Sequence, residues 1–199
     1  MKQNIAIAIR LLCVLTLMTG FLYPLMMTLF ASAVFPSKAG GSLIERHGTT
    51  VGSGLIGQLT DSSVYFHNRP SAAAYTTLPS GASNASPTNQ TLQDSMAARR
   101  KRFTTENGIG PGTSVPLEMI SASASGLDPH ISPDAALLQV DRVAKARGFD
   151  SLQRRSLELL VRSHIEPPQF GFLGQARVNV LQLNLAIDME KGFAASRRP

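Results

Sequence analysis

The most pronounced feature of the hydropathy pattern is a long apolar segment near the start of the chain. No charged side chain occurs between Leu11 and Ser37, and residues 11–34 are almost continuously apolar. As a helix that rises about 1.5 Å per residue, these 24 residues extend over about 36 Å. The hydrocarbon core of a bilayer is only about 30 Å thick. The pattern therefore predicts a membrane-spanning helix, kinked in its outer half by Pro24, which lacks a backbone N–H.

The charges that flank this segment predict its orientation. Lys2 and Arg10 precede it, whereas the first basic residue on the other side is Lys38. Positively charged flanks tend to remain in the cytoplasm. In a bacterial cell the rest of the chain would then lie in the periplasm, anchored to the inner membrane. The predicted division is a cytoplasmic N-terminus at residues 1–10, a transmembrane helix at residues 11–34 and a periplasmic domain at residues 35–199.

A cleaved signal peptide is the alternative interpretation of the same segment. Ala31, Ser32 and Ala33 resemble a cleavage site, and cleavage there would release a secreted binding protein. The apolar core of a signal peptide usually has about 7–15 residues. The segment here is about twice as long, which favours an uncleaved anchor.

The chain after the anchor begins with β-leaning and irregular sequence. Short runs at residues 42–44, 55–58 and 64–66 are typical of strands between glycine-rich turns. Residues 79–95 are rich in Ser, Asn, Pro and Thr and almost free of charge, which predicts an irregular surface loop.

The last third of the chain has a helical pattern. Ser132 is a good N-cap for a helix that Gly148 would end, and Asp150 or Ser151 would cap a second helix that stops before a Pro-Pro pair. The run that follows predicts a short strand leading into a final helix near Asn179. Strands early and helices late favour a single α+β domain.

Composition and motifs exclude several classes of function. The single cysteine, Cys13, has no partner for a disulfide within the chain, and the four histidines lie singly, without the spacing of a metal site. The net charge of +6 is too dispersed to indicate nucleic-acid binding, and no G-x-x-x-x-G-K-[ST] loop occurs. We therefore expect no metal, no tightly bound cofactor and no nucleic acid. The basic run at residues 99–102 favours a solvated helix face, with an acidic partner surface or anionic lipid as the alternative.

One local cluster resembles a hydrolytic site. Ser123, Ser125, Asp128 and His130 include a nucleophile, a base and an acid, and would make the chain a membrane-anchored periplasmic hydrolase. Catalytic triads usually converge from separate elements, however. A turn around Gly126 that leads into the helix at residue 132 explains the same residues and is favoured.

Several longer motifs are distributed from the anchor to about residue 188. They are GFLYP at residues 20–24, VGSGLIGQ at 51–58, YFHNRPSA at 65–72, SASGLDPHIS at 123–132, Gln139 with Arg142, Val143 and Ala144, and VNVL at 178–181 with Asn184 and Leu185. Together, and in the same order, they resemble the C subunit of the Kdp potassium-transporting P-type ATPase. The one visible departure is Leu59, where Phe is expected after Gln58.

This resemblance implies an accessory, non-catalytic subunit of an inner-membrane complex that imports potassium at the expense of ATP. Its partners would be a potassium-channel-like pore subunit and a P-type ATPase catalytic subunit, and it would stabilise the assembly and promote ATP use. The chain itself lacks the D-K-T-G-T phosphorylation motif. The resemblance also implies nucleotide-associated residues, although the predicted topology places them across the membrane from cytoplasmic ATP. They are Ser125, Gly126, Leu127, Asp128 and Gln139.

Overall fold

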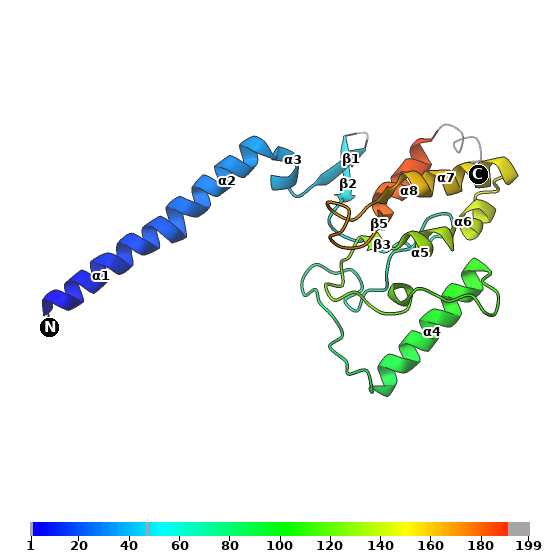
Figure 1. Ribbon diagram of the computed structural model, residues 1–199, viewed down its shortest axis with the longest axis horizontal. Helices are drawn as coiled ribbons and strands as arrows, with labels where there is room; N and C mark the ends of the chain where they lie inside the picture. Colours follow the sequence, from blue (N-terminus) through cyan, green and yellow to red (C-terminus); the bar gives the residue numbers. More distant parts are fainter. Residues whose placement is uncertain (1, 47, 191–199) are drawn as a thin grey trace. The chain divides into compact units, whose positions relative to one another are not determined.

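The computed structural model describes residues 2–46 and 48–190, which fall into two compact units, Met1–Ser53 and Gly54–Pro199. The first unit is a long helix followed by a short helical turn and a two-stranded hairpin (Figure 1). Its elements are α1 (Lys2–Thr16), the π-helical η1 (Leu17–Leu22), α2 (Tyr23–Val34), α3 (Pro36–Ala39), β1 (Leu43–Arg46) and β2 (Thr49–Ser53).

The first three elements form one apolar helix. It extends over 33 residues, Lys2–Val34, and none of its most apolar window is buried against other parts of the chain. It is long and apolar enough to cross a membrane. Pro24 does not end it, because η1 shifts the hydrogen bonding just before the proline: the Tyr23 N–H donates to the Met18 carbonyl. A π-helical stretch therefore accommodates the proline within a continuous helix.

The hairpin after the helix confirms one of the expected strands. β1 and β2 pair antiparallel, with Leu43 opposite Ser53 and Arg46 opposite Thr49, and a bulge lies between Ile44 and Glu45. Residues 43 and 44 of the strand expected at residues 42–44 thus belong to β1, which continues to Arg46.

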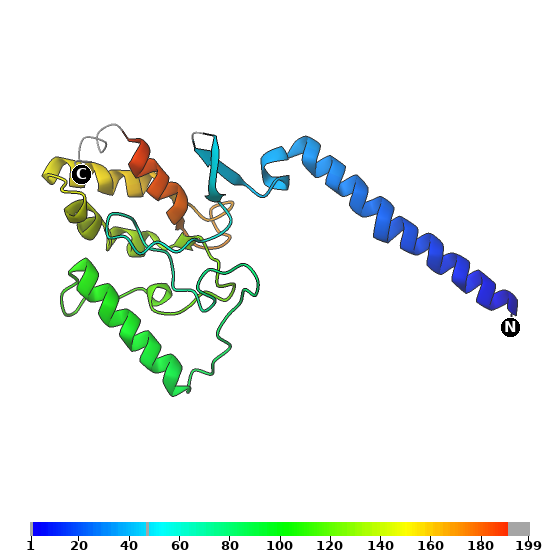
Figure 2. The same ribbon diagram turned by 180° about the vertical axis from the view of Figure 1, so that it is seen from behind.

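The second unit is an α+β domain built on a small antiparallel sheet of order β3-β5-β4. Figure 2 shows this unit from behind, with α4 along one side and α5 to α8 gathered on the other. Its elements are α4 (Gln90–Asn107), the 3-10 turn η2 (Leu117–Met119), β3 (His130–Ile131), α5 (Pro133–Leu137), α6 (Val140–Ala146), α7 (Ser151–Ser163), β4 (Ile165–Glu166), β5 (Arg177–Asn179) and α8 (Val180–Met189). The core contains Phe66, Phe103, Ile131, Val143, Leu157, Val161, Val178, Leu183 and Ile187, each at most 5% exposed.

The helix signals of the last third are confirmed. The Ser132 hydroxyl accepts from the Ala135 N–H at 3.1 Å, and Gly148 ends the helical region with φ +67°. The region is divided into α5 and α6 instead of forming one helix. Asp150 caps α7 by exchanging hydrogen bonds with Gln153, and Asn179 ends β5 and caps α8.

Two expectations about the first part of this unit are wrong, and a third is correct only in part. The irregular loop ends at Asn89, whose side chain accepts from the Leu92 N–H and starts α4, so residues 90–95 are helical. Residues 55–58 and 64–66 contain no strand. Their backbone groups are engaged by distant parts of the domain, as described below.

Candidate functional site

Two side-chain amides bind the backbone of residues 66 and 67 in place of a neighbouring strand. Asn184 on α8 accepts from the Phe66 N–H at 2.8 Å and donates to the Phe66 carbonyl at 3.0 Å. Gln139, fully buried between α5 and α6, accepts from the His67 N–H at 2.8 Å and donates to its carbonyl at 3.3 Å. Because these groups are satisfied by side chains, the apolar run at residues 64–66 does not pair as a strand.

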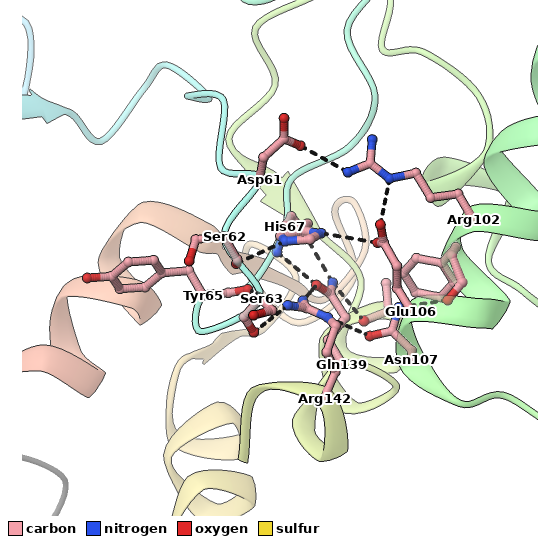
Figure 3. A network of polar contacts seen from close by, with 12 residues as sticks. Asp61, Ser62, Ser63, Tyr65, His67, Arg102, Glu106, Asn107, Gln139 and Arg142 are labelled. Carbon is pink, nitrogen blue, oxygen red and sulfur yellow. Dashed lines mark hydrogen bonds and ion pairs between the residues drawn. The ribbon is translucent and has the colours of Figure 1, made fainter. Parts of the chain in front are cut away.

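Arg142 on α6 completes the attachment of this segment. Its Nη1 donates to the Ser63 carbonyl at 2.7 Å and to the Tyr65 carbonyl at 3.0 Å (Figure 3). Its Nη2 donates to Gln139 Oε1 at 2.8 Å, and its Nε donates to Asn107 Oδ1 on α4 at 3.0 Å. Burial lowers the pKa of Arg142 to about 10, so the guanidinium stays charged at neutral pH. Arg142 therefore joins α4, α6 and residues 63–65.

A chain of charged groups continues from this network toward the surface. Arg102 on α4 donates from Nε to Glu106 Oε1 at 2.6 Å and from Nη2 to Asp61 Oδ1 at 3.2 Å. The His67 Nδ1 lies 3.8 Å from Glu106 Oε2. Burial, and next the charge of Arg142, lower the pKa of His67, so this imidazole is neutral at pH 7. Figure 3 shows these groups bridging α4 and the segment that contains Asp61 and His67.

A cleft of about 310 Å³ lies between α4 and residues 59–75. The basic run contributes Arg99 and Arg102 to its wall, while Arg100 and Lys101 are exposed as expected for a solvated helix face. Asn68 also lines the cleft, and its buried Oδ1 has no hydrogen-bond partner among the described residues. Within residues 2–46 and 48–190, no group of three His, Cys, Asp or Glu side chains could hold a metal ion.

The two serines of the hydrolase hypothesis make hydrogen bonds with neighbouring backbone. Asp128 Oδ1 lies 3.5 Å from His130 Nδ1, so an acid and an imidazole do meet. Ser123 is buried, 3% exposed, and its N–H donates to the Pro70 carbonyl, while the Ser125 hydroxyl accepts from the Leu127 N–H. Among the contacts of the described residues, neither serine hydroxyl bonds to His130. The geometry matches the turn interpretation.

The residues that the resemblance associates with nucleotide fall into two neighbouring groups. Ser125, Gly126, Leu127 and Asp128 form one turn, and Asp128 Oδ2 accepts from Arg69 Nη1 at 2.8 Å. Gln139 belongs instead to the network around His67 and Arg142. Residues 67–69 connect the two groups along the chain, because His67 contacts Gln139 and Arg69 contacts Asp128. The nucleotide-associated site stays a prediction, and its residues belong to two polar clusters.

Close backbone contact fixes this turn against residue 57. The Gly57 N–H donates to the Leu127 carbonyl at 2.8 Å, and a Cβ at position 57 would lie 2.6 Å from the Asp128 carbonyl oxygen. Gly57→Ala is therefore expected to lower the free energy of unfolding by about 1–3 kcal/mol, as overpacking does. Urea denaturation measures this change. Gly110→Ala is the matched control, because a Cβ there meets nothing within 4 Å, and an equal loss in both variants would contradict the prediction.

The ionised Asp128 stabilises the same turn in a pH-dependent way. Burial alone would raise the pKa of Asp128, but hydrogen bonds from His130 and Arg69 outweigh it and lower the pKa to about 2, from an ordinary 3.8. The stabilisation is therefore present above about pH 4 and is lost as the pH falls toward 2. We expect unfolding free energies measured from pH 5 to pH 2 to fall less in Asp128→Asn than in the wild type. The exposed Asp94→Asn should retain the wild-type slope; a slope unchanged in Asp128→Asn would refute the assignment.

Three of the organising residues attracted no structural prediction from the sequence. Arg142 and Asn184 entered only as part of the resemblance. Arg147 did not enter at all, although its Nε donates to the Val64 carbonyl at 2.7 Å and its Nη2 donates to Asp188 Oδ1 at 3.1 Å. Arg142 and Asn184 each stand among buried apolar neighbours of a helix, Val143 and Leu183 among them. A polar residue within an apolar helix face indicates a buried hydrogen-bonding role, and this signal could have identified both.

Comparison with known proteins identifies the family to which the chain is similar. The family model described as the K+-transporting ATPase, C chain, matches residues 5–189. A potassium-transporting ATPase KdpC subunit of Rhodospirillum rubrum is 50% identical over 192 residues, covering 94% of this chain and 96% of the relative. The KdpC subunits of Rhodopseudomonas palustris (strain BisB18) and Gemmatimonas aurantiaca are each 46% identical, covering 96% and 100% of this chain and 100% and 98% of their own. Since the match extends over nearly the whole length of this chain and of its relatives, the chain belongs to the KdpC family, the C chain of K+-transporting ATPases.

Proposed function

We propose that this chain is a membrane-anchored accessory subunit of an ATP-driven potassium import complex. It has no catalytic activity of its own, and it stabilises the assembly and promotes ATP use by the catalytic subunit. The relatives are named as subunits of a potassium-transporting ATPase, which supports a role within such a complex. Potassium is then the transported ion, and ATP acts through the complex.

The observation that carries this proposal is the apolar helix Lys2–Val34, which has no buried residue and no charged side chain beyond Arg10. A single helix cannot enclose an ion path, but it can pack against the helices of subunits that do. Lipid does not drive helices together by the hydrophobic effect, so such packing relies on close contact and polar groups. Gly20 lies on this helix, and Thr19 and Thr28 satisfy their hydroxyls on carbonyls one turn back.

The topology follows from the same flanking charges. We infer a cytoplasmic N-terminus, a span in the bacterial inner membrane and a periplasmic domain, because Lys2 and Arg10 precede the apolar segment and no basic residue follows it before Lys38. Protease treatment of intact spheroplasts tests this, since Arg100 and Lys101 are exposed on α4. Cleavage in intact spheroplasts supports the periplasmic location, and cleavage only after lysis contradicts it.

Co-purification tests the function directly. A tagged chain, co-expressed with the other subunits and extracted in mild detergent, is expected to retain a large multi-span P-type ATPase subunit and the pore subunit. Recovery of the tagged chain alone, with its fold intact, would overturn the proposal. A strain that lacks only this subunit should lose potassium uptake through this complex and regain it with the tagged chain.

The nucleotide-associated role stays a separate part of the proposal. Photoaffinity labelling of the purified complex with an azido-ATP would place label on the turn at residues 125–128 if this stretch contacts nucleotide. Label confined to the catalytic subunit would remove that role and leave the accessory role standing.

A further inference from the structure

The connection between β4 and β5 presents two uncovered aromatic rings. Residues 167–176 form this hairpin loop, and every residue from 169 to 175 is exposed. Phe170 is 87% exposed, Phe172 is 75% exposed and Leu173 is 49% exposed. Isolated surface apolar residues are common, but three within four positions of one loop tip form a contiguous apolar feature. We call these three side chains the aromatic tip.

The loop that carries the aromatic tip is rigidly attached to the core. It leads into β5, the central strand of the sheet, where Val178 is fully buried. At its base the Arg177 Nε donates to Glu166 Oε2 at 2.9 Å across the two strands. Near its end, Gln169 and Leu173 exchange two backbone hydrogen bonds of 2.9 Å. The loop is therefore closed at both ends.

The backbone of the tip is held in an unfavourable conformation. Phe170 has φ +54°, in the left-handed region that bulky side chains avoid, and Gly171 follows with φ +82°. Such strain is typical of binding sites, where the surrounding structure maintains it. Here the strained residue carries an aromatic ring that is exposed to solvent, so its side chain adds little to the stability of the isolated domain.

We propose that the aromatic tip docks into an uncharged, apolar pocket on another subunit of the potassium-transporting ATPase. This inference rests on the proposed function, because it names the surface through which the accessory subunit is held. Aromatic anchors on a preformed loop lose little conformational freedom on binding, which makes them effective interface residues. A pocket that buries them must itself be free of unpaired charge, since a desolvated charge would oppose binding.

The charge of the loop favours a protein pocket over a lipid surface. No charged side chain occurs from residue 167 to residue 176, and Arg177 is paired with Glu166. Loops and helices that insert into the anionic face of a membrane usually combine aromatic residues with lysine or arginine. The aromatic tip has no such electrostatic component, so its complement is an apolar protein surface.

Truncation of the rings tests the docking in the full complex. Phe170→Ala with Phe172→Ala should reduce the amount of this chain retained on the tagged catalytic subunit, after a detergent wash, by at least about tenfold. The matched control is Leu152→Ala with Leu159→Ala, which removes two exposed side chains (73% and 62%) from α7 and should leave retention unchanged. Urea denaturation of the isolated chain checks that neither variant unfolds. Wild-type retention of the phenylalanine variant would overturn the inference, whereas failure of the wild type to co-purify would instead overturn the proposed function.

A thiol probe distinguishes the occupants of the surface. Phe172→Cys in a Cys13→Ser background places the only thiol of the chain on the aromatic tip. A water-soluble maleimide should label it in the isolated chain, in detergent and in liposomes, but at least about tenfold more slowly in the complex. Equal labelling everywhere would overturn the inference. Protection in liposomes without other subunits, or protection that depends on the concentration of the isolated chain, would also overturn it in favour of lipid or a second copy.

Discussion

Arg142→Met is expected to lower the free energy of unfolding by about 3–5 kcal/mol, because several acceptors in and around the core lose their donor and each unsatisfied buried acceptor costs about 1–3 kcal/mol. Methionine fills much of the same volume but donates no hydrogen bond. The carbonyls of Ser63 and Tyr65 and the side-chain oxygen of Asn107 would each lose the Arg142 donor that they have in the wild type. Urea denaturation of the full chain in micelles, followed by tyrosine near-UV circular dichroism, measures the change.

Two further variants make this prediction specific. Arg142→Lys keeps the charge but cannot reproduce the planar fork of donors. We therefore expect its free energy of unfolding to lie between those of the wild type and Arg142→Met. Arg100→Met removes an exposed arginine from α4 and should change stability by no more than about 0.5 kcal/mol. A similar loss in Arg100→Met and Arg142→Met would show that the buried network is not the cause. Because Arg142 holds residues 63–65, its loss should also increase hydrogen exchange at the Phe66 and His67 amides.

Leu17→Arg is expected to impair membrane anchoring by about 2.5–3.5 kcal/mol, the penalty for an arginine at the centre of a spanning helix. Leu17 lies near the middle of Lys2–Val34 and is 62% exposed in the isolated chain, so its substituent would face lipid or a partner helix. Carbonate extraction of membranes, which releases proteins that are not integrally anchored, measures the retained fraction. Retention should fall in Leu17→Arg.

The control for this variant preserves the apolar surface. Leu17→Met keeps a side chain of similar volume and polarity and should leave retention at the wild-type level. If Leu17→Arg were retained as fully as Leu17→Met, the helix would not be the membrane anchor, and the proposed function would lose its main support. The co-purification experiment, repeated with Leu17→Arg, asks whether a chain that has lost its membrane anchor still binds the other subunits through the domain at residues 54–190.

The features that could be predicted from the sequence depend on neighbouring residues. The length and charge of the apolar segment predict one spanning helix whatever the rest of the chain does. The caps at Ser132, Asp150 and Asn179 bind N–H groups only three residues away, so their effect is local and the helices begin where the sequence indicates. The family resemblance depends on several long motifs in a fixed order, which are read directly from the sequence. The comparison with known proteins confirms it.

The tertiary structure alone decided how residues 55–68 fold. The sequence favours strands at residues 55–58 and 64–66, yet the backbone of residues 63–67 bonds to Gln139, Arg142 and Asn184. The Gly57 N–H likewise bonds to the Leu127 carbonyl, so each of these partners lies 70 or more residues further along the chain. No local pattern can state which distant side chain will reach a given carbonyl, because that depends on how α6 and α8 pack. The two groups of predicted nucleotide-associated residues likewise belong to different elements, because Gln139 precedes α6 and residues 125–128 form a turn before β3. Burial makes these long-range bonds obligatory, since an unpaired polar group in the core is costly, and so they override the local preference for a strand.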